Sequence, residues 1–231
     1  MARIARVVVP GNPHHVIQRG NRRQQTFFGR EDYNAYLGFM ADWCRRCQVE
    51  IWAYCLLPNQ VHLIATPETE DGLRRAIGEA HKRYSTRINT REGWRGHLWQ
   101  GRFSSYPLDE HHLLWAARFI EMTPIYNGLA QKPEDYPWSS APAHMRGRND
   151  YLVKVKPLLE QMPNWGGFLL EPLEPRMIQA LIQHEKTGRP LGDSAFLTQC
   201  ENRLHRFLNR RKPGPKPQRG KEGLPMGLEM N

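Results

Sequence analysis

Residues 49–66 read VEIWAYCLLPNQVHLIAT. Two runs within it, Val49 to Leu56 and Gln60 to Thr66, are rich in the β-branched and aromatic residues that favour strands. The intervening Leu57-Pro58-Asn59 contains proline and asparagine, which are typical of turns. The stretch therefore predicts two strands joined by a hairpin-like connection.

Segments on both sides of this hairpin extend the pattern. In chain order they are a short strand at His14–Arg19, a helix at Arg30–Cys47, a helix at Asp71–Asn89, a strand at Phe103–Pro107, and a third helix that runs from Asp109 to about Thr123 and is ended by Pro124. Asp71 and Asp109 are expected to cap the helices that follow them. This order predicts an α+β fold with a ferredoxin-like split βαββαβ antiparallel sheet and one added helix, over roughly residues 10–125.

The chain divides into three predicted parts. They are a sheet domain at residues 1–145, a helical C-terminal region at residues 146–208, and a basic tail rich in proline and glycine at residues 209–231. The helical region contains two amphipathic segments, one ending near Gly188 and one capped by Asp193. Alternate prolines in the tail remove hydrogen-bond donors and fix φ, so we expect the tail to be extended and flexible.

Positive charge dominates the composition. Lys and Arg number 33 against 23 for Asp and Glu, which gives a net charge of +10, and the segment from Arg203 to Lys221 contributes eight basic residues and no acidic one. Such a balance indicates a polyanionic partner, with nucleic acid first and an anionic membrane surface second. No run approaches the roughly 20 apolar residues that cross a bilayer, no signal peptide is evident, and four cysteines in 231 residues do not make a disulfide framework. We expect a soluble cytoplasmic protein with reduced thiols.

Candidate DNA contacts fall into three groups. They are Arg19, Arg22 and Arg23 after the first strand; Arg95, His97, Trp99, Gln100 and Arg102 in the connection before the fourth strand; and Arg210, Arg211, Lys212 and Lys216 in the tail. Cations neutralise phosphates, and Trp94 or Trp99 is suited to stack on an unpaired base. The alternative for each tryptophan is packing in the core, where this residue type is mostly buried.

Several motifs resemble one known family. The motifs are Gly11-x-Pro13-His14-His15-Val16, Gln18-Arg19-Gly20-Asn21-Arg22, Leu57-Pro58-Asn59-Gln60-Val61-His62-Leu63-Ile64, Gly96-His97-Leu98-Trp99-Gln100-Gly101-Arg102-Phe103, Asp135-Tyr136-Pro137-Trp138-Ser139-Ser140 and Thr187-Gly188-Arg189-Pro190-Leu191-Gly192-Asp193. In this order they resemble the landmarks of the REP-associated tyrosine transposases, which are HUH single-tyrosine enzymes of the IS200-like transposase family.

The resemblance implies a ferredoxin-like domain that binds single-stranded DNA folded into a hairpin and cuts it by phosphoryl transfer to one tyrosine. In that family, two histidines at i and i+2 on a strand and a third ligand from the last helix hold a divalent cation. Residues at i and i+2 of a strand point to the same face, and the cation would polarise the scissile phosphate. The attacking tyrosine keeps the phosphodiester energy in a covalent link.

This sequence departs from the family at the positions that carry the chemistry. Gln60 replaces the first histidine and His62 remains; Phe119 aligns with the tyrosine and Thr123 with the third ligand, both anchored by Pro124. Phenylalanine has no oxygen to attack phosphorus. It would also suit an engineered substrate trap, but a trap normally keeps its metal site. Gln60, His62 and Thr123 form a neutral set that is poor for a hard cation, and His62 is equally well explained as a satisfied polar residue on a sheet face.

We therefore expect a domesticated, transposase-like DNA-binding protein of a bacterial nucleoid that recognises hairpin-forming, REP-like single-stranded DNA and does not cleave it. No cofactor is needed for binding, and Mg²⁺ or Mn²⁺ matters only if cleavage activity remains. One alternative is an active single-strand transposase or nickase that uses substituted residues, with Tyr84, Tyr106 and Tyr126 as weak candidates. Another is an RNA-binding or membrane-surface module. Both a monomer and a dimer are open.

Overall fold

A computed structural model describes residues 5–208 of the chain. The predicted tail contacts Arg210, Arg211, Lys212 and Lys216, and the whole 209–231 segment, lie outside these described residues. None of the helices in the described part is long and apolar enough to cross a membrane.

A four-stranded sheet forms the centre of the molecule. Its strands are β1 (His14–Arg19), β2 (Val49–Leu57), β3 (Gln60–Pro67) and β4 (Ser104–Pro107), in the spatial order β2-β3-β1-β4. Each neighbouring pair is antiparallel. This order and the helices between the strands confirm the predicted α+β, ferredoxin-like fold, and the strand bounds agree with the sequence prediction to within one residue.

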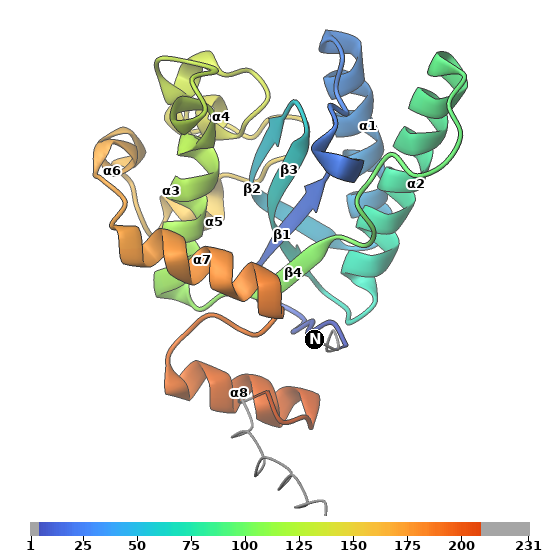
Figure 1. Ribbon diagram of the computed structural model, residues 1–231. Coiled ribbons are helices and arrows are strands. Elements are labelled where there is room, and N and C mark those ends of the chain that lie inside the picture. Colours follow the sequence, from blue (N-terminus) through green and yellow to red (C-terminus); the bar gives the residue numbers. More distant parts are fainter. Residues whose placement is uncertain (1–4, 209–231) are drawn as a thin grey trace, which may run out of the picture.

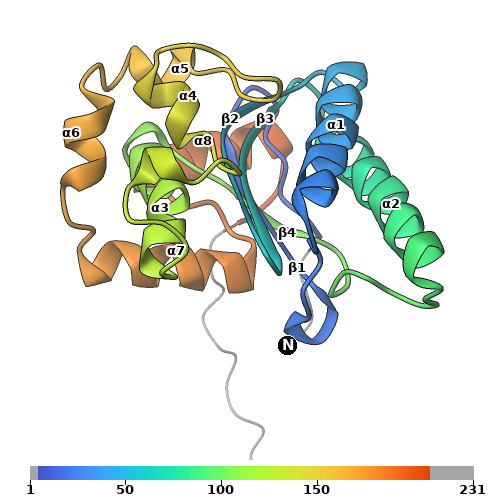
Figure 2. The same ribbon diagram turned by 90° about the horizontal axis from the view of Figure 1, so that it is seen from above.

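Two helices cover one face of the sheet, as Figures 1 and 2 show from two directions: α1 (Arg30–Arg46) and α2 (Gly72–Glu92). Apolar side chains at three- and four-residue steps, such as Tyr36 and Met40, are fully buried against the sheet. The predicted cap of α2 is wrong in detail. Asp71 is the N-cap residue, but its carboxylate accepts from Arg74 and makes no side-chain cap bond.

The third helix, α3 (Glu110–Tyr126), crosses the opposite face. Asp109 caps it as predicted, since its Oδ1 accepts from the backbone N–H of His112 at 2.8 Å. The prediction that Pro124 ends the helix is wrong. Proline lacks one N–H and so removes one backbone hydrogen bond, but it lies in the last turn, and the Asn127 N–H still donates to the Thr123 carbonyl. The helix therefore continues past the proline.

The rest of the described chain packs on the α3 side or beneath the sheet (Figure 1). It consists of α4 (Ala141–Met145), α5 (Lys156–Leu159), α6 (Trp165–Leu170), α7 (Pro175–Thr187) and α8 (Ser194–Leu204), and two short 3-10 helices, η1 (Asn21–Arg23) and η2 (Pro133–Asp135), complete the set of elements. Buried residues of 146–208 join the same apolar clusters as the sheet, among them Val153, Leu158 and Leu181. The predicted helical region thus shares its core with the sheet domain.

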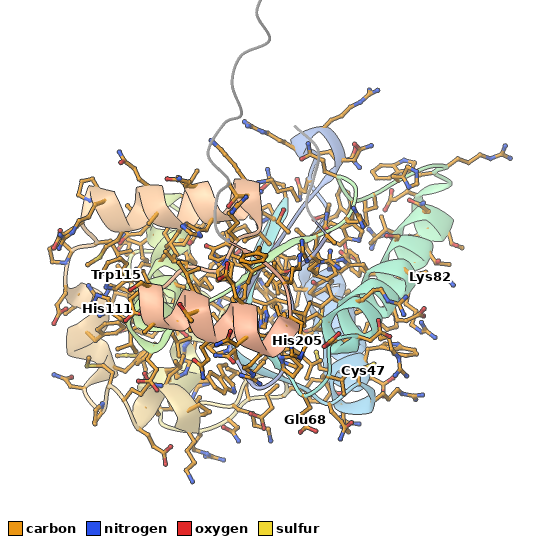
Figure 3. The ribbon with its side chains drawn as sticks, turned by 90° about the horizontal axis from the view of Figure 1, so that it is seen from below. Cys47, Glu68, Lys82, His111, Trp115 and His205 are labelled. Atoms are coloured by element: carbon orange, nitrogen blue, oxygen red, sulfur yellow. The ribbon has the colours of Figure 1, made fainter. Side chains whose placement is uncertain are left out.

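Helix α8 lies beneath the sheet, and Figure 3 looks up at it from below. Phe196, Cys200 and Leu208 form a third apolar cluster with Val7 and Val9, which precede the first strand. His205 ends α8 with a left-handed backbone conformation, at φ 47°. The beginning and the end of the described chain are therefore packed together.

Candidate functional site

Strands β1 and β3 place two histidines on the sheet face that α3 covers. Ile17 pairs with His62 and His15 pairs with Ile64, and alternate residues of a strand share a face. His15, His62 and Gln60 therefore project to the same side. Sequence reasoning identified His62 and Gln60 but missed His15 as a member of the site, although the alternation of β1 next to β3 was available to find it.

The side chains on this face form a chain of hydrogen bonds, which we call the histidine relay. Gln60 Nε2 lies 2.6 Å from His62 Nε2, His62 Nδ1 lies 3.0 Å from His15 Nε2, and His15 Nδ1 lies 2.8 Å from the Tyr106 hydroxyl. The Tyr106 hydroxyl donates to the backbone carbonyl of Leu181 in α7 at 3.1 Å. Four links thus run from the open end of β3 to the C-terminal helical region.

The carbonyl of Leu181 fixes the direction of every proton in the relay. A carbonyl can only accept, so the single proton of the Tyr106 hydroxyl goes to it. His15 Nδ1–H must then donate to the tyrosine oxygen, and His15 Nε2 must accept from His62 Nδ1–H. His62 Nε2 is left as an acceptor and receives an N–H of Gln60. This assignment satisfies every ring nitrogen of both histidines.

Burial keeps both rings neutral. His62 is 3% exposed and His15 2%. Desolvation, with a smaller contribution from Arg19, lowers the pKa of His62 to about 3. Desolvation, the neighbouring His62 and Arg19 lower the pKa of His15 well below its usual value. The relay consequently carries no charge near neutral pH.

Helix α3 places Phe119 and Thr123 over the two histidines. The Phe119 ring centroid lies 5.8 Å from that of His62 and 6.4 Å from that of His15. Thr123, one turn further on, donates its hydroxyl proton to the Phe119 carbonyl at 2.6 Å. The two residues predicted to occupy the nucleophile and third-ligand positions do lie on one helix face next to His62.

A cleft of about 420 Å³ opens between these elements. It is lined by His15, Arg19, Arg23, Leu57, Asn59, Gln60, His62, Phe119, Thr123, Asn127, Leu181, Ile182 and Glu185. The sequence predicted the Gln60, His62, Phe119 and Thr123 part of this lining. It gave no signal for Leu181, Ile182 and Glu185, because no local pattern in α7 shows that this helix docks on β4.

The residues of the cleft do not fit the divalent cation that the fold family implies. The His62 lone pair that a metal would use already accepts from Gln60, and the Thr123 hydroxyl is hydrogen bonded to its own helix. Within residues 5–208, no three His, Cys, Asp or Glu side chains converge in a way that could hold a metal ion. Neutral donors of this kind are poor ligands for Mg²⁺ or Mn²⁺.

Arg19, predicted to contact DNA, is bound to a carboxylate instead. Both of its terminal nitrogens donate to Glu185 of α7, one of them at 3.0 Å to Oε2. Burial, and then the nearby Arg23, lower the pKa of Arg19. The ion pair closes one side of the cleft, so Arg19 is not a free cation in this structure.

The remaining predicted contacts separate into exposed and buried residues. Those that are exposed are Arg22, Arg23, Arg95, His97, Gln100 and Arg102. Trp99 is only 7% exposed, because its ring packs on His81 and Tyr84 at centroid distances of 4.8 and 5.8 Å. The prediction that Trp99 contacts DNA therefore does not fit its position in the core. Trp94 is 43% exposed and lies beside Phe28, which is 42% exposed, with ring centroids 5.7 Å apart.

The sheet order, the covering helices and a strand-borne histidine facing the last helix of the sheet domain define a ferredoxin-like α+β domain with a histidine-lined cleft. Residues 10–123 match the family model of the IS200-like transposases, and over this part of its length the chain belongs to that family. A search of curated proteins finds no significant match.

One solved structure shares this fold. A REP-associated tyrosine transposase bound to a REP hairpin superposes with a TM-score of 0.55 at 21% sequence identity, covering 67% of this chain and 92% of that one. A transposase structure from Deinococcus radiodurans gives a TM-score of 0.37 at 19% identity, covering 55% of this chain and 98% of that one.

Proposed function

We propose that this protein binds hairpin-forming single-stranded DNA and does not cleave it. The observation that carries the proposal is the pairing of Phe119 with the closed histidine relay, since the first removes the nucleophile and the second occupies the metal-binding lone pair of His62. Under this proposal DNA binding needs no cofactor. A divalent cation would matter only for DNA cleavage, which we do not propose for this cleft.

Support for DNA as the partner comes from relatives and from charge. The similar transposase is bound to a REP hairpin, and this chain carries a net charge of +10. The exposed Arg22 and Arg23 follow β1, and the exposed Arg95 follows α2. A backbone hydrogen bond joins these two connections, since the Asn21 N–H donates to the Leu98 carbonyl at 2.8 Å. Such clustered cations neutralise phosphates.

An exposed aromatic pair beside these cations favours a strand with unpaired bases. Phe28 and Trp94 meet edge to face, and the Arg91 guanidinium lies 5.7 Å from the Phe28 ring centroid. Arg91 is itself held by Asp32, whose carboxylate it contacts at 3.1 Å from Nη2. Aromatic faces presented among cations bind single strands by stacking, so Trp94 replaces Trp99 as the stacking residue.

The absence of cleavage is supported by the positions of the tyrosines. Among the described residues, no tyrosine lines the cleft. Tyr84 and Tyr106 are fully buried. Tyr126 does lie on the same helix as Phe119, contrary to the expectation based on Pro124, but Phe119, Thr123 and Asn127 face the cleft and Tyr126 does not.

A cleavage assay tests the proposal. The protein is incubated with Mg²⁺ or Mn²⁺ and a strand carrying a REP-like hairpin, and covalent adducts are sought by mass spectrometry. We expect hairpin binding without strand scission or adduct. An adduct on any tyrosine would show an active enzyme with substituted residues. Competition by structured RNA or by anionic vesicles at equal concentration, stronger than by hairpin DNA, would contradict DNA as the partner.

A further inference from the structure

We infer that the cleft has become a pocket for one unpaired nucleobase of the bound strand. This inference rests on the proposed function and assigns a ligand class to the site that no longer suits cleavage. It is carried by the orientation of the Gln60 amide, by the mainly uncharged lining of the cleft, and by the Phe119 ring.

The relay gives the Gln60 amide one orientation. Because His62 Nε2 must accept, the amide nitrogen and not the amide oxygen faces the histidine. Within residues 5–208 this is the one hydrogen bond that the structure gives the Gln60 side chain. Its second N–H and its carbonyl oxygen are left as an adjacent donor and acceptor on a cleft-lining side chain. A free amide edge of this kind is the group that pairs with a base edge.

The base that we expect is adenine. A glutamine amide makes two hydrogen bonds to adenine at once, accepting from N6 and donating to N7. The backbone of Gln60 is held in the β1–β3 ladder opposite Arg19, and its side chain is held by the relay, so little conformational freedom remains to be lost when the base binds.

The rest of the lining suits a flat, uncharged ring better than an anion or a cation. Phe119 offers an aromatic surface for stacking, and Leu181 and Ile182 of α7 provide apolar contacts. The charge of Arg19 is neutralised by Glu185 within the same cleft, which leaves Arg23 as the exposed cation of the lining. Arg23 can hold the phosphate of the same nucleotide. A volume of about 420 Å³ lies within the roughly 300–1,000 Å³ of ligand pockets.

The experiment is an abasic scan. A REP-like hairpin with single-stranded flanks is prepared with an abasic site at each flank position in turn, and then with each of the four bases at any sensitive position. Dissociation constants are measured by fluorescence anisotropy at fixed ionic strength, without divalent cation. We expect one flank position at which loss of the base weakens binding about tenfold, with adenine preferred, since a bidentate base contact is worth about 1–3 kcal/mol.

Two variants connect that position to Gln60. Gln60→Ala should make the abasic and adenine strands bind equally, and Gln60→Glu, which keeps the side-chain size but removes the N–H donors, should remove the preference for adenine. Gln161→Ala is the matched control, because Gln161 is an exposed glutamine on the C-terminal side of α5, is not part of the cleft lining, and bonds only within its own turn. It should retain the wild-type pattern. Thermal melts check that all three variants are folded.

Failure of this inference is distinct from failure of the proposed function. Absence of any hairpin binding by the wild-type protein would overturn both. Hairpin binding with no sensitive flank position, or with the same sensitivity in Gln60→Ala, would overturn the base pocket alone. If free adenosine binds as tightly as the strand, the cleft binds a small molecule. If the same hairpin made of RNA binds with a lower dissociation constant than the DNA hairpin, the cleft binds RNA. Either result contradicts the inference.

Discussion

Helix α3 carries two polar networks on its two sides, and they differ in charge and in access. The cleft side holds the neutral histidine relay with Phe119 above it. The other side buries Glu121 completely, where its carboxylate accepts from Ser140 Oγ, from His144 Nδ1 at 2.6 Å and from Trp165 Nε1 at 2.7 Å. One helix thus borders an open site and fastens the C-terminal helices.

The difference shows which network the fold depends on. A buried carboxylate is stable only while its hydrogen-bond donors remain in place. The hydrogen bonds of Glu121 therefore hold α4 and α6 against α3. The relay has neutral members, and Gln60 at its open end is only partly buried. Substitutions at the open end therefore change binding with little cost in stability, which makes the cleft the side where function can change.

The largest expected effect is on the closed network. Glu121→Ala leaves His144 and Trp165 buried without their acceptor and leaves Ser140 Oγ only the Tyr54 carbonyl at 3.3 Å. We expect the free energy of unfolding to fall by about 3–5 kcal/mol. Urea denaturation measures this. Glu110→Ala, an exposed position of the same helix, is the control and should cost less than about 1 kcal/mol. Equal small losses from both changes would mean that the fold does not depend on the hydrogen bonds of Glu121.

Restoring the family residues tests the open side. Phe119→Tyr alone should give at most weak metal-dependent cleavage, because Gln60 still occupies the His62 lone pair. Adding Gln60→His and Thr123→Asn should raise the rate on the order of 100-fold, the scale of a cation that contributes several kcal/mol. The readout is covalent adduct per unit time on a hairpin strand. Equal rates for the single and triple variants would show that Gln60 and Thr123 already serve as ligands.

Acid should weaken the fold through the neutral histidines. His62 titrates near pH 3 in the folded protein and near 6.5 when unfolded, so its pKa is lowered by folding. The contribution of neutral His62 to the free energy of unfolding is therefore complete above pH 6.5 and is lost as the pH falls toward 3. Below pH 6, each buried neutral histidine should lower the free energy of unfolding by about 1 kcal/mol for each pH unit. His14 and His81 are also buried with lowered pKa values, about 4 and about 3.

Urea unfolding at several pH values measures the slope of the free energy of unfolding against pH. His62→Gln removes one of the groups and should flatten the slope by about one proton in the interval from pH 6 to pH 4. An unchanged slope in this variant would mean that His62 is protonated in the folded protein, and the direction assigned to the relay would then be wrong.

The smallest expected effect on selectivity comes from the basic tail. Residues 209–231 include six Lys or Arg. If about four of them contact single-stranded phosphates, truncation after Leu208 should flatten the slope of log affinity against log salt by roughly 3, at about 0.7 per contact. Affinity for a hairpin and for a scrambled strand should fall by a similar factor. Loss of hairpin preference alone would mean that the tail reads structure.

Much of the fold could be predicted from local pattern. Proline and glycine bound β1, proline and asparagine form the β2–β3 turn, and alternation along the strands placed His62 and Gln60 on one face. The end of α3 could not be predicted in this way, since the cost of one missing N–H at Pro124 is outweighed by the packing of the last turn: Thr123 and Pro124 are both buried.

The site was predictable only where its members lie on neighbouring strands or on one helix face. Phe119 and Thr123 are four residues apart and so share a face. Glu185 is 166 residues from Arg19, and no local rule connects them. The sequence left the role of Trp99 open, because a tryptophan between cations suits both stacking on a base and burial in the core. In the structure Trp99 is buried, since its ring packs on His81 and Tyr84 of α2.

The contact between α8 and the segment before β1 has a consequence for the order of folding. Arg203 donates to the side chain of Asn12 and to the carbonyl of Pro10, across 191 and 193 residues of sequence. Contacts this distant close a long loop and form slowly compared with local ones. During synthesis, Val7 and Val9 leave the ribosome early, whereas their cluster partners Phe196, Cys200 and Leu208 are made roughly 190 residues later. We therefore expect this apolar cluster to be completed only when the end of the described chain has been synthesised.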